Sequence, residues 1–346
     1  MEDRWIKIKK PLLDWYNTAH RQLPWRMTKN PYYVWISEIM LQQTRVEAVK
    51  GYYSRFLEEI PDVMSLARIS EERLLKLWEG LGYYNRARNL QRAAIRIMEE
   101  YQGEFPKEYE QVLDLPGIGE YTAGAICSIC YNLPTPAVDG NVLRVMTRVS
   151  EWNACIDDAS TKKMAREILL VLYEEGNCSD LTQALMELGA VICIPNGEPK
   201  CQECPLRAMC MARKNHTYAN LPVRKEKQQR RIEKKTVFVL RANGQYGIRK
   251  RADKGLLAGM WEFPHVDSNM TPSEAMTYLS KQGLEPVLLE REVPYTHIFS
   301  HVEWRMKAYY IACQNQCKEL NWVAYEDLEE TYALPTAFKA FLEKEL

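Results

Sequence analysis

Apolar side chains recur every three or four residues from Trp5 to about Cys210. This period places them on one face of an α-helix, whereas the alternation typical of strands is nearly absent from this part of the chain. The helical pattern is interrupted by residues that begin or end helices, namely Pro31, Pro61, Gly103 and Pro134. We therefore predict an all-helical domain here.

The pattern changes farther along the chain. Two short runs, 236–240 and 246–250, flank Asn243-Gly244, a pair that suits the positive φ angles of a tight hairpin turn. The elements predicted after this hairpin are a helix at 272–282 between Thr271 and Gly283, strands at 287–293 and 302–311, and a last helix near 336–344. This order predicts a second, smaller α/β domain.

A basic segment separates the two patterns. Residues 221–235 read LPVRKEKQQRRIEKK, with seven basic residues, two acidic residues and little to bury. We favour a solvated tether over a dedicated phosphate clamp, although one segment can serve as both. The predicted organisation is a helical domain at 1–215, a basic linker at 216–235 and an α/β domain at 236–346.

Composition narrows the class of protein. Hydrophobic residues make up 46% of the chain and charged residues 27%, and no apolar run approaches the roughly 20 residues needed to cross a bilayer. The N-terminal MEDRWIKIKKPLLDWY does not resemble a secretory signal, so a cytoplasmic protein is expected, and nothing in the sequence suggests more than a monomer. A formal net charge of zero leaves nucleic acid open as a partner, because phosphate binding depends on where the basic residues lie.

Four of the ten cysteines form a compact cluster. The spacing is C-x7-C-x2-C-x5-C, over Cys193, Cys201, Cys204 and Cys210. Zinc ribbons usually present two short C-x2-C elements far apart, and only one is present, so the spacing favours a [4Fe-4S] cluster over a four-thiolate zinc site. The other six cysteines are expected to be core or surface thiols.

A glycine-containing turn is predicted between two helices. Residues 115–123 read LPGIGEYTA, in which Gly117 and Gly119 allow backbone amides to face outward at a helix N-terminus and to bind phosphate. No strand is predicted before it, which argues against a dinucleotide-binding loop. Taken alone, the turn is equally typical of an ordinary helix–helix connection.

Two acidic residues have the environments that a glycosidic cleavage needs. Glu38 lies in the apolar stretch VWISEIMLQQT, where loss of solvent should raise its pKa and keep it partly protonated. Asp139 in TPAVDGNVLRV precedes a helix, whose N-terminus favours the carboxylate anion. A proton donor and an anion are required to protonate a leaving base and to stabilise an oxocarbenium-like sugar. Without this context, Asp139 would be only a helix cap and Glu38 an exposed helix position.

These motifs together resemble a known superfamily. The LPGIGEYTA hairpin, the VDGNV aspartate and the cysteine cluster resemble the endonuclease III-like helix-hairpin-helix DNA glycosylases. Within it, LPWR at 23–26, SEIMLQQT at 37–44, GLGYYNRARNL at 80–90 and the second domain are similar to the MutY family of adenine glycosylases. The resemblance implies a multidomain α and α+β fold: a helical glycosylase domain with a [4Fe-4S] cluster loop and a C-terminal Nudix-like α/β domain. The helical domain would contain a six-helix subdomain at 29–135 and a cluster subdomain from 1–28 and 136–215.

The resemblance also implies an activity and its residues. The substrate would be double-stranded DNA with adenine opposite 8-oxoguanine or guanine, and the adenine would be flipped out and removed in base excision repair. Glu38 would protonate adenine at N7, and Asp139 would stabilise the sugar cation with the support of Tyr121 and Asn141. Further substrate and DNA contacts are implied at Arg26 and Gln183 in the adenine pocket, and at Gln43, Leu81, Tyr83, Gly117 and Gly119.

Four further features refine this expectation. Lyase-active relatives carry a lysine at the position of Tyr121, so a monofunctional glycosylase is expected. Residues 255–264 match the Nudix-like fold, but the helix at 272–282 holds only Glu274 of the acidic residues needed for magnesium, so no pyrophosphatase activity is expected. The resemblance assigns reading of 8-oxoguanine to Phe299, Ser300 and His301. The seven residues between the first two cluster cysteines, where the family has six, imply a one-residue extension of that loop.

Three alternatives stay open at this point. A bifunctional pyrimidine glycosylase of the same fold is disfavoured by Tyr121 and by the additional domain. A non-catalytic protein that binds damaged DNA is disfavoured because both Glu38 and Asp139 are present. A zinc-binding scaffold would yield a colourless protein without iron.

Overall fold

The computed structural model describes residues 2–174, 176–226 and 229–342. Two compact units are present, and the chain passes between them more than once. The first comprises residues 1–68 and 89–226, and the second comprises residues 69–88 and 227–346. The segment 69–88 therefore leaves the predicted helical domain and groups with the C-terminal part.

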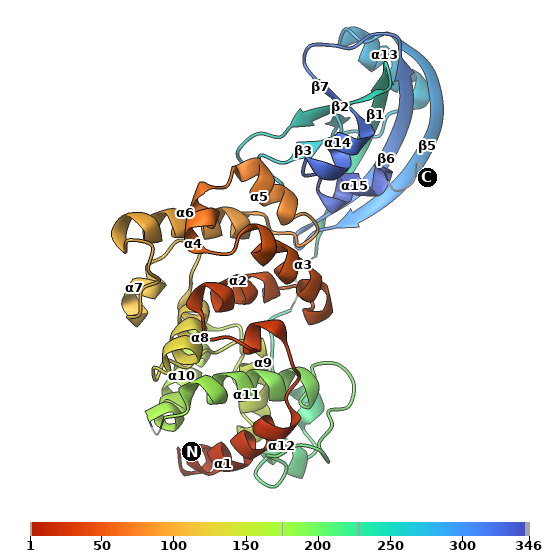
Figure 1. Ribbon diagram of the computed structural model, residues 1–346. Helices are drawn as coiled ribbons and strands as arrows, with labels where there is room; N and C mark the ends of the chain where they lie inside the picture. The colour runs from red at the N-terminus through yellow and green to blue at the C-terminus, as the bar shows by residue number, and fades with distance from the viewer. Residues whose placement is uncertain (1, 175, 227–228, 343–346) are drawn as a thin grey trace. The chain divides into compact units, whose positions relative to one another are not determined.

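The first unit is helical, as predicted (Figure 1). In chain order its elements are α1 (Glu2–Ala19), η1 (Pro24–Arg26), α2 (Pro31–Leu41), α3 (Val46–Glu59), α4 (Val63–Arg68), α6 (Asn85–Glu100, which begins in the second unit), α7 (Tyr109–Leu113), α8 (Glu120–Tyr131), α9 (Gly140–Ser150), α10 (Ala159–Glu174), α11 (Cys178–Val191), α12 (Met211–Lys214) and η2 (Tyr218–Asn220). One core cluster joins α1, α9, α10 and α11 through buried side chains such as Trp5, Val142, Leu169 and Leu185. This packing fixes α9 and α11, two of the helices that carry the site described below.

Local sequence explains where these helices begin. The side chain of Asn30 caps α2 by accepting a hydrogen bond of 2.9 Å from the Tyr32 amide, and Pro31 occupies the first turn, where no amide donor is needed. The side chain of Asp139 caps α9 in the same way, through the Val142 amide at 2.7 Å. Asn132 ends α8 in the left-handed conformation.

The second unit contains a seven-stranded mixed sheet in the order β3-β2-β1-β6-β5, with β4 paired to β1 and β7 paired to β2. Its elements are α5 (Glu71–Leu77), β1 (Arg231–Ala242), β2 (Gln245–Lys250), β3 (Trp261–Glu262), β4 (His265–Val266), α13 (Pro272–Lys281), β5 (Pro286–Ile298), β6 (Val302–Cys313), β7 (Asn321–Val323), α14 (Tyr325–Glu330) and α15 (Thr336–Leu342). Strands β1 and β6 are parallel, and β5 and β6 are antiparallel.

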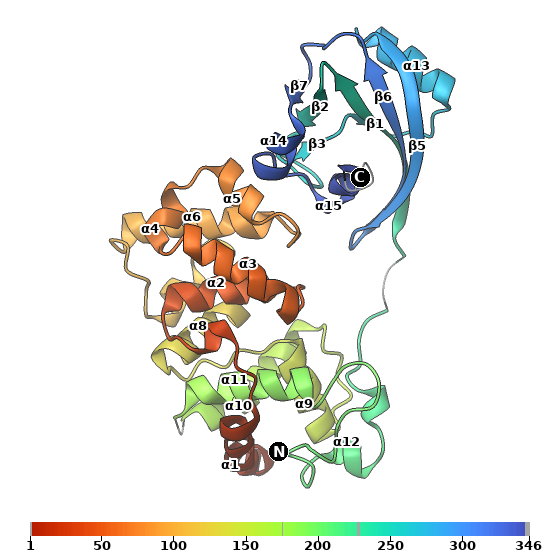
Figure 2. The ribbon, with the colours of Figure 1, turned by 45° about the vertical axis from the view of Figure 1, so that its right-hand side comes forward.

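Both faces of this sheet are covered. Val237 and Val239 of β1 point into a core shared with α14 and α15, whereas Phe238 and Leu240 point into a core shared with α13. Consecutive strand residues face opposite sides, so a strand buried on both faces reads as the continuous apolar run VFVL. Figures 1 and 2 show α13 on one side of the sheet and α14 and α15 on the other.

Helix α5 is held within the second unit. The Lys76 ammonium donates to the carbonyl oxygens of Leu328 and Tyr332 at 3.1 and 3.2 Å, and it pairs with Glu79 at 2.8 Å. The Glu79 carboxylate also accepts from the Leu334 amide at 3.2 Å. Helix α5, which lies within the predicted helical domain at 1–215, is thus attached to the C-terminal sheet domain.

The structure confirms most of the predicted elements and corrects one. The Asn243-Gly244 turn has positive φ angles of 53° and 75°, and the predicted helix at 272–282 is α13. Strand β1, however, begins at Arg231, so five residues of the predicted 216–235 linker belong to the sheet. The cause is pairing with β6, which starts at Arg231↔Val302 and is invisible in a local pattern of charged residues. Residues 343–344 of the predicted last helix, and 227–228 of the linker, lie outside the described residues.

Within the described part of the chain, no helix is both long and apolar enough to cross a membrane.

Candidate active site

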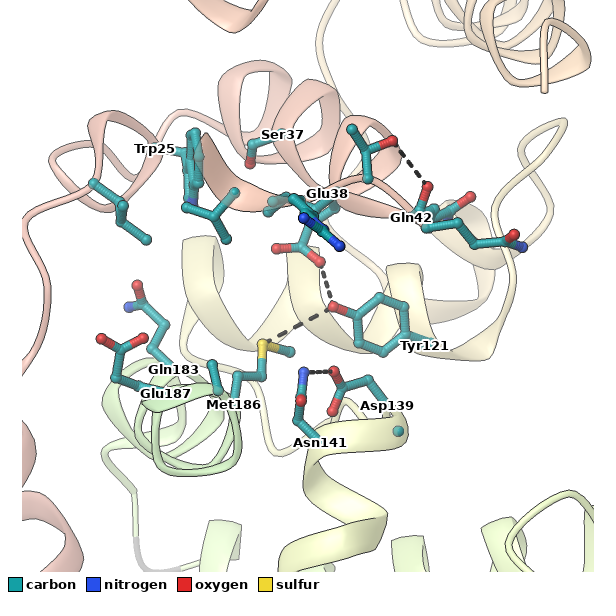
Figure 3. Close-up of a pocket in the computed structure, with 18 of the residues that line it drawn as sticks. Trp25, Ser37, Glu38, Gln42, Tyr121, Asp139, Asn141, Gln183, Met186 and Glu187 are labelled. Atoms are coloured by element: carbon teal, nitrogen blue, oxygen red, sulfur yellow. Dashed lines mark hydrogen bonds between the residues drawn. The ribbon is translucent and has the colours of Figure 1, made fainter. Parts of the chain in front are cut away.

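A cavity of about 730 Å³ lies in the first unit. Its walls come from α2, α8, α11 and the start of α9, together with the loops that follow α1 and α2. Figure 3 shows Glu38, Tyr121, Asp139 and Asn141 pointing toward one another in this cavity. The two acidic residues singled out in the sequence therefore meet at one site.

Glu38 lies on α2 and is buried. Burial raises the pKa of its carboxyl group to about 7, even though a hydrogen bond from the Tyr121 hydroxyl lowers it. That bond measures 2.6 Å from the Tyr121 hydroxyl to Oε2 of Glu38. Since Oε2 accepts from Tyr121, Oε1 is the oxygen left to carry a proton into the cavity.

Asp139 precedes α9 and also lies in the buried wall of the cavity. Its Oδ1 accepts from the Val142 amide and its Oδ2 accepts from Nδ2 of Asn141, both at 2.7 Å. These bonds favour the anion, yet burial outweighs them and raises the pKa of Asp139 above its ordinary value. The expected preference for the anion at the helix N-terminus is thus opposed by the loss of solvent, which the sequence pattern did not reveal.

Tyr121 contacts Glu38 directly. The resemblance implied that Tyr121 supports Asp139 in stabilising the sugar cation, which stays a prediction; in the structure its hydroxyl group donates to Glu38. The Met186 sulfur lies 3.9 Å from the same hydroxyl group. Burial raises the pKa of Tyr121 well above its ordinary value, so the hydroxyl group stays a neutral donor.

Glu187 lines the same cavity and was not predicted from the sequence. Glu187 of α11 is buried and accepts from Arg21 at 2.6 Å and from Arg26 at 2.7 Å. Burial by itself would raise the pKa of Glu187, but the two arginines lower it to about 2, so this carboxylate is an anion. The signal for it was its position four residues after Gln183, which places both side chains on one face of α11.

The start of α9 is tied to the cysteine loop. The Arg144 guanidinium donates to Oδ1 of Asn141 at 2.8 Å, to the Gly189 carbonyl at 2.7 Å and to the Cys193 carbonyl at 2.7 Å. The next basic residue along the helix, Arg148, donates to the Cys193 sulfur at 3.4 Å and to the Ile194 carbonyl at 3.0 Å. One helix therefore contacts both the cavity and the loop that carries the cysteines.

All four cluster cysteines line one pocket, together with Arg148 and Arg213. Among the described residues, no group of three or more His, Cys, Asp or Glu side chains already has the arrangement of a metal site. Burial raises the pKa of Cys204 to about 12, so the thiolate form requires a cation nearby. Four thiols that line one pocket are nevertheless the ligand type that a soft metal centre prefers.

The hairpin between α7 and α8 has the predicted form. Gly117 has a φ of 77°, and a Cβ atom there would lie 2.5 Å from Cβ of Asn89, so only glycine fits. Gly119 occupies the N-cap position of α8. Phosphate binding by the amides at this helix start stays a prediction.

The remaining predicted residues fall into two groups. Arg26, Gln43 and Gln183 line the same cavity as Glu38. Leu81, Tyr83, Phe299, Ser300 and His301 belong to the second unit. Within that unit, the Tyr83 hydroxyl is hydrogen-bonded to the Ser300 hydroxyl, Tyr83 and His301 are exposed, and Leu81 is buried.

Comparison with known proteins places both units in known families. A model described as the HhH-GPD superfamily of base excision DNA repair proteins matches residues 36–175, and a NUDIX domain model matches residues 236–344. A solved structure of a thermostable thymine-DNA glycosylase aligns with a TM-score of 0.55 and 28% identity, over 62% of this chain and 98% of that one. The helical domain therefore has the fold that the motifs implied.

Two relatives align over most of the chain. The adenine DNA glycosylase of Arabidopsis thaliana is 34% identical over 89% of this chain and 57% of the relative, so this chain spans less than two thirds of that protein's length. The adenine DNA glycosylase of Rattus norvegicus is 31% identical over 96% of this chain and 76% of the relative. With the helical and Nudix-like domains both matched in order, the chain belongs to the adenine DNA glycosylase family.

Proposed function

We propose that this chain is a monofunctional base-excision-repair glycosylase that hydrolyses the N-glycosidic bond of adenine paired with 8-oxoguanine or guanine in double-stranded DNA. The observation that carries the proposal is the meeting of Glu38 and Asp139 in one cavity, with a pKa of about 7 for Glu38. A carboxyl group that is half protonated near neutral pH can act as a general acid there.

The chemistry begins with adenine extruded from the duplex, at a cost of a few kcal/mol. Glu38 donates its proton to N7 of the base, so that the electron pair of the C1′–N9 bond leaves with a neutral adenine. Asp139 faces the positive charge that develops on the sugar, and the Asn141 amide and Val142 backbone amide hold the orientation of its carboxylate. Water then adds to C1′ and gives up a proton to the Glu38 carboxylate, which restores the acid and leaves a neutral abasic site.

Base binding would involve the polar end of the cavity. Arg26 is fixed by its ion pair with Glu187, and Gln183 lies on the same helix as Glu187. Such fixed polar groups can hydrogen-bond an adenine edge without reorganisation. Opposite-base recognition is assigned to Phe299, Ser300 and His301 in the second unit, where Tyr83, expected to enter the base stack, is hydrogen-bonded to Ser300.

Cys193, Cys201, Cys204 and Cys210 are the ligands of a [4Fe-4S] cluster in this proposal. When bound, such a cluster cross-links the four thiolates into one rigid loop. The chain's own contribution is Arg148, whose guanidinium lies 3.4 Å from the Cys193 sulfur and balances thiolate charge.

The protein is proposed to act on genomic DNA as a monomer.

The activity is tested by base release from duplexes that carry adenine opposite 8-oxoguanine, guanine or thymine. We expect release opposite 8-oxoguanine and guanine, with strand breaks only after alkali treatment, because Tyr121 cannot form the Schiff base of a lyase. The Glu38→Gln variant should bind the same duplexes and release no adenine. Release by that variant, or efficient borohydride trapping of wild type on DNA, would refute the assigned chemistry.

The metal assignment is tested separately by iron and zinc analysis of the purified protein. We expect a brown protein with iron and labile sulfide, and loss of iron in Cys204→Ser. A Cys313→Ser variant removes a buried thiol outside the cluster and serves as the control. A colourless wild type with stoichiometric zinc would overturn the cluster.

A further inference from the structure

The beginning of the predicted linker is fixed on the first unit. Val223 forms a parallel bridge with Cys155, and its carbonyl accepts from the Ile156 amide at 3.0 Å. Two residues later, the Lys225 amide donates to Oδ2 of Asp157 at 2.9 Å. The backbone on both sides of Arg224 is therefore held in place, unlike that of a free tether.

Because the backbone is held in place here, the side chains of Arg224 and Lys225 point in different directions. In an extended segment, consecutive side chains leave on opposite sides. The Lys225 ammonium pairs with Asp158 at 2.9 Å, whereas Arg224 lines the catalytic cavity. A Cβ atom on Gly140, the residue directly after Asp139, would lie only 3.6 Å from Nη2 of Arg224.

Arg224 also differs from the other arginines of the cavity in its partners. Five arginines line this cavity: Arg21, Arg26, Arg45, Arg144 and Arg224. Arg21 and Arg26 are neutralised by Glu187, and Arg144 is occupied by Asn141 and backbone carbonyls. Among residues 2–174, 176–226 and 229–342, the guanidinium groups of Arg224 and Arg45 have no hydrogen-bond or ion-pair partner, and of these two Arg224 is the one beside Gly140.

The guanidinium group of Arg224, which has no partner beside Gly140, can bind an anionic group of the substrate. A nucleotide extruded into the cavity brings a phosphate on each side of its sugar, and the guanidinium fork matches phosphate oxygens. We propose that Arg224 binds the DNA phosphate adjoining the extruded adenosine and so holds the sugar against Asp139. This inference rests on the proposed glycosylase function.

The first test compares Arg224→Gln with Lys225→Gln, which removes the same charge from the adjacent residue. The probe is a duplex with 2′-fluoro-2′-deoxyadenosine opposite 8-oxoguanine, because the fluorine slows cleavage by destabilising the sugar cation. We expect Arg224→Gln to raise Kd about tenfold and to reduce the slope of log K against log salt by about one. Lys225→Gln should leave both close to wild type.

The second test locates the phosphate. Single neutral methylphosphonates are placed at each phosphate flanking the adenosine, and Kd is measured for wild type and Arg224→Gln. At one position, the substitution should weaken wild type about tenfold and leave the variant unchanged, because both changes remove the same contact. Arg224→Lys should recover part of the affinity.

The outcomes separate this inference from the proposed function. If wild type releases adenine but Arg224→Gln equals Lys225→Gln in Kd and salt dependence, the inference fails and the glycosylase proposal stands. Equal weakening of both proteins by every methylphosphonate also overturns it. If wild type releases no adenine from any duplex, the proposed function itself fails.

Discussion

Glu38 and its two polar neighbours determine the acid chemistry of the cavity. Burial raises the pKa of Glu38, Tyr121 lowers it by donating a hydrogen bond, and Asp139 raises it again by its charge. Because burial is the largest of these effects, the acid depends more on the apolar packing of α2 than on any single polar partner. The apolar residues around Glu38 are thus part of the proposed active site.

The first prediction concerns the pH dependence of base release. Glu38 must be protonated to act, so the single-turnover rate should fall as pH rises through about 7. Tyr121→Phe removes a bond that lowers the pKa of Glu38, so the midpoint of this fall should move to higher pH. Single-turnover rates from pH 5 to pH 9 measure both, and an unchanged midpoint in Tyr121→Phe would contradict the assigned contact.

The same group links pH to stability. The folded-state pKa of about 7 exceeds the ordinary 4.5, so the folded protein binds this proton more tightly than the unfolded chain. Stability from Glu38 is therefore present at low pH and is lost as pH rises through the folded value. Relative to wild type, Glu38→Gln should gain about 3 kcal/mol of unfolding free energy between pH 4.5 and pH 8. Denaturant titration measures this, and a pH-independent difference would count against it.

Helices α9 and α11 approach each other closely where they reach the cavity. A Cβ atom on Gly189 of α11 would lie 2.5 Å from Cβ of Asn141 and 3.0 Å from its backbone oxygen. Asn141 in turn holds Asp139. The absence of a side chain at Gly189 therefore allows the close packing of two helices that positions Asp139.

Gly189→Ala should displace the start of α9 and lower both stability and activity. Overpacking of this kind typically costs about 1–3 kcal/mol, and a shift of Asp139 should slow base release more than it weakens binding. Gly51→Ala in α3 is the matched control, because nothing lies within 4 Å of a Cβ atom there. That change should stabilise α3 by about 1 kcal/mol. If Gly189→Ala kept wild-type activity, the close contact between Gly189 and Asn141 would not control the position of Asp139.

On the scale of the whole molecule, the division into units does not follow the order of the chain. Residues 69–88 belong with the C-terminal sheet domain, through the buried pair of Lys76 and Glu79 and their backbone partners. Tyr83 and Ser300, both expected at the DNA, lie in this same unit. The residues proposed to read the opposite base and Tyr83 therefore lie in the same compact unit.

Glu79→Ala should destabilise the second unit by about 3 kcal/mol, because it leaves the buried Lys76 ammonium without its carboxylate. Amide hydrogen exchange should rise in residues 69–88 and in α14 and α15, with little change around Asp139. Glu71→Ala removes an ion pair to Arg88 whose acid is 56% exposed, and it should cost less than about 1 kcal/mol. Equal effects of the two substitutions would show that the Lys76–Glu79 pair does not hold the segment.

The amino-acid sequence determined the class of fold and the identity of the main reactive groups. Helical periodicity, the Asn243-Gly244 turn, the caps of α9 and α13 and the cysteine spacing are local features, so they are readable without coordinates. The resemblance of longer motifs to a known family then predicted the roles of Glu38 and Asp139.

Only the tertiary structure decided how these groups meet and which neighbours tune them. The Tyr121 contact with Glu38 joins residues 83 positions apart, and the Arg21 contact with Glu187 joins residues 166 positions apart. The pKa of Asp139 depends on burial by other helices, and β1 begins early because β6 pairs with it. Packing across such separations depends on the whole chain at once, which is why a local pattern cannot specify it.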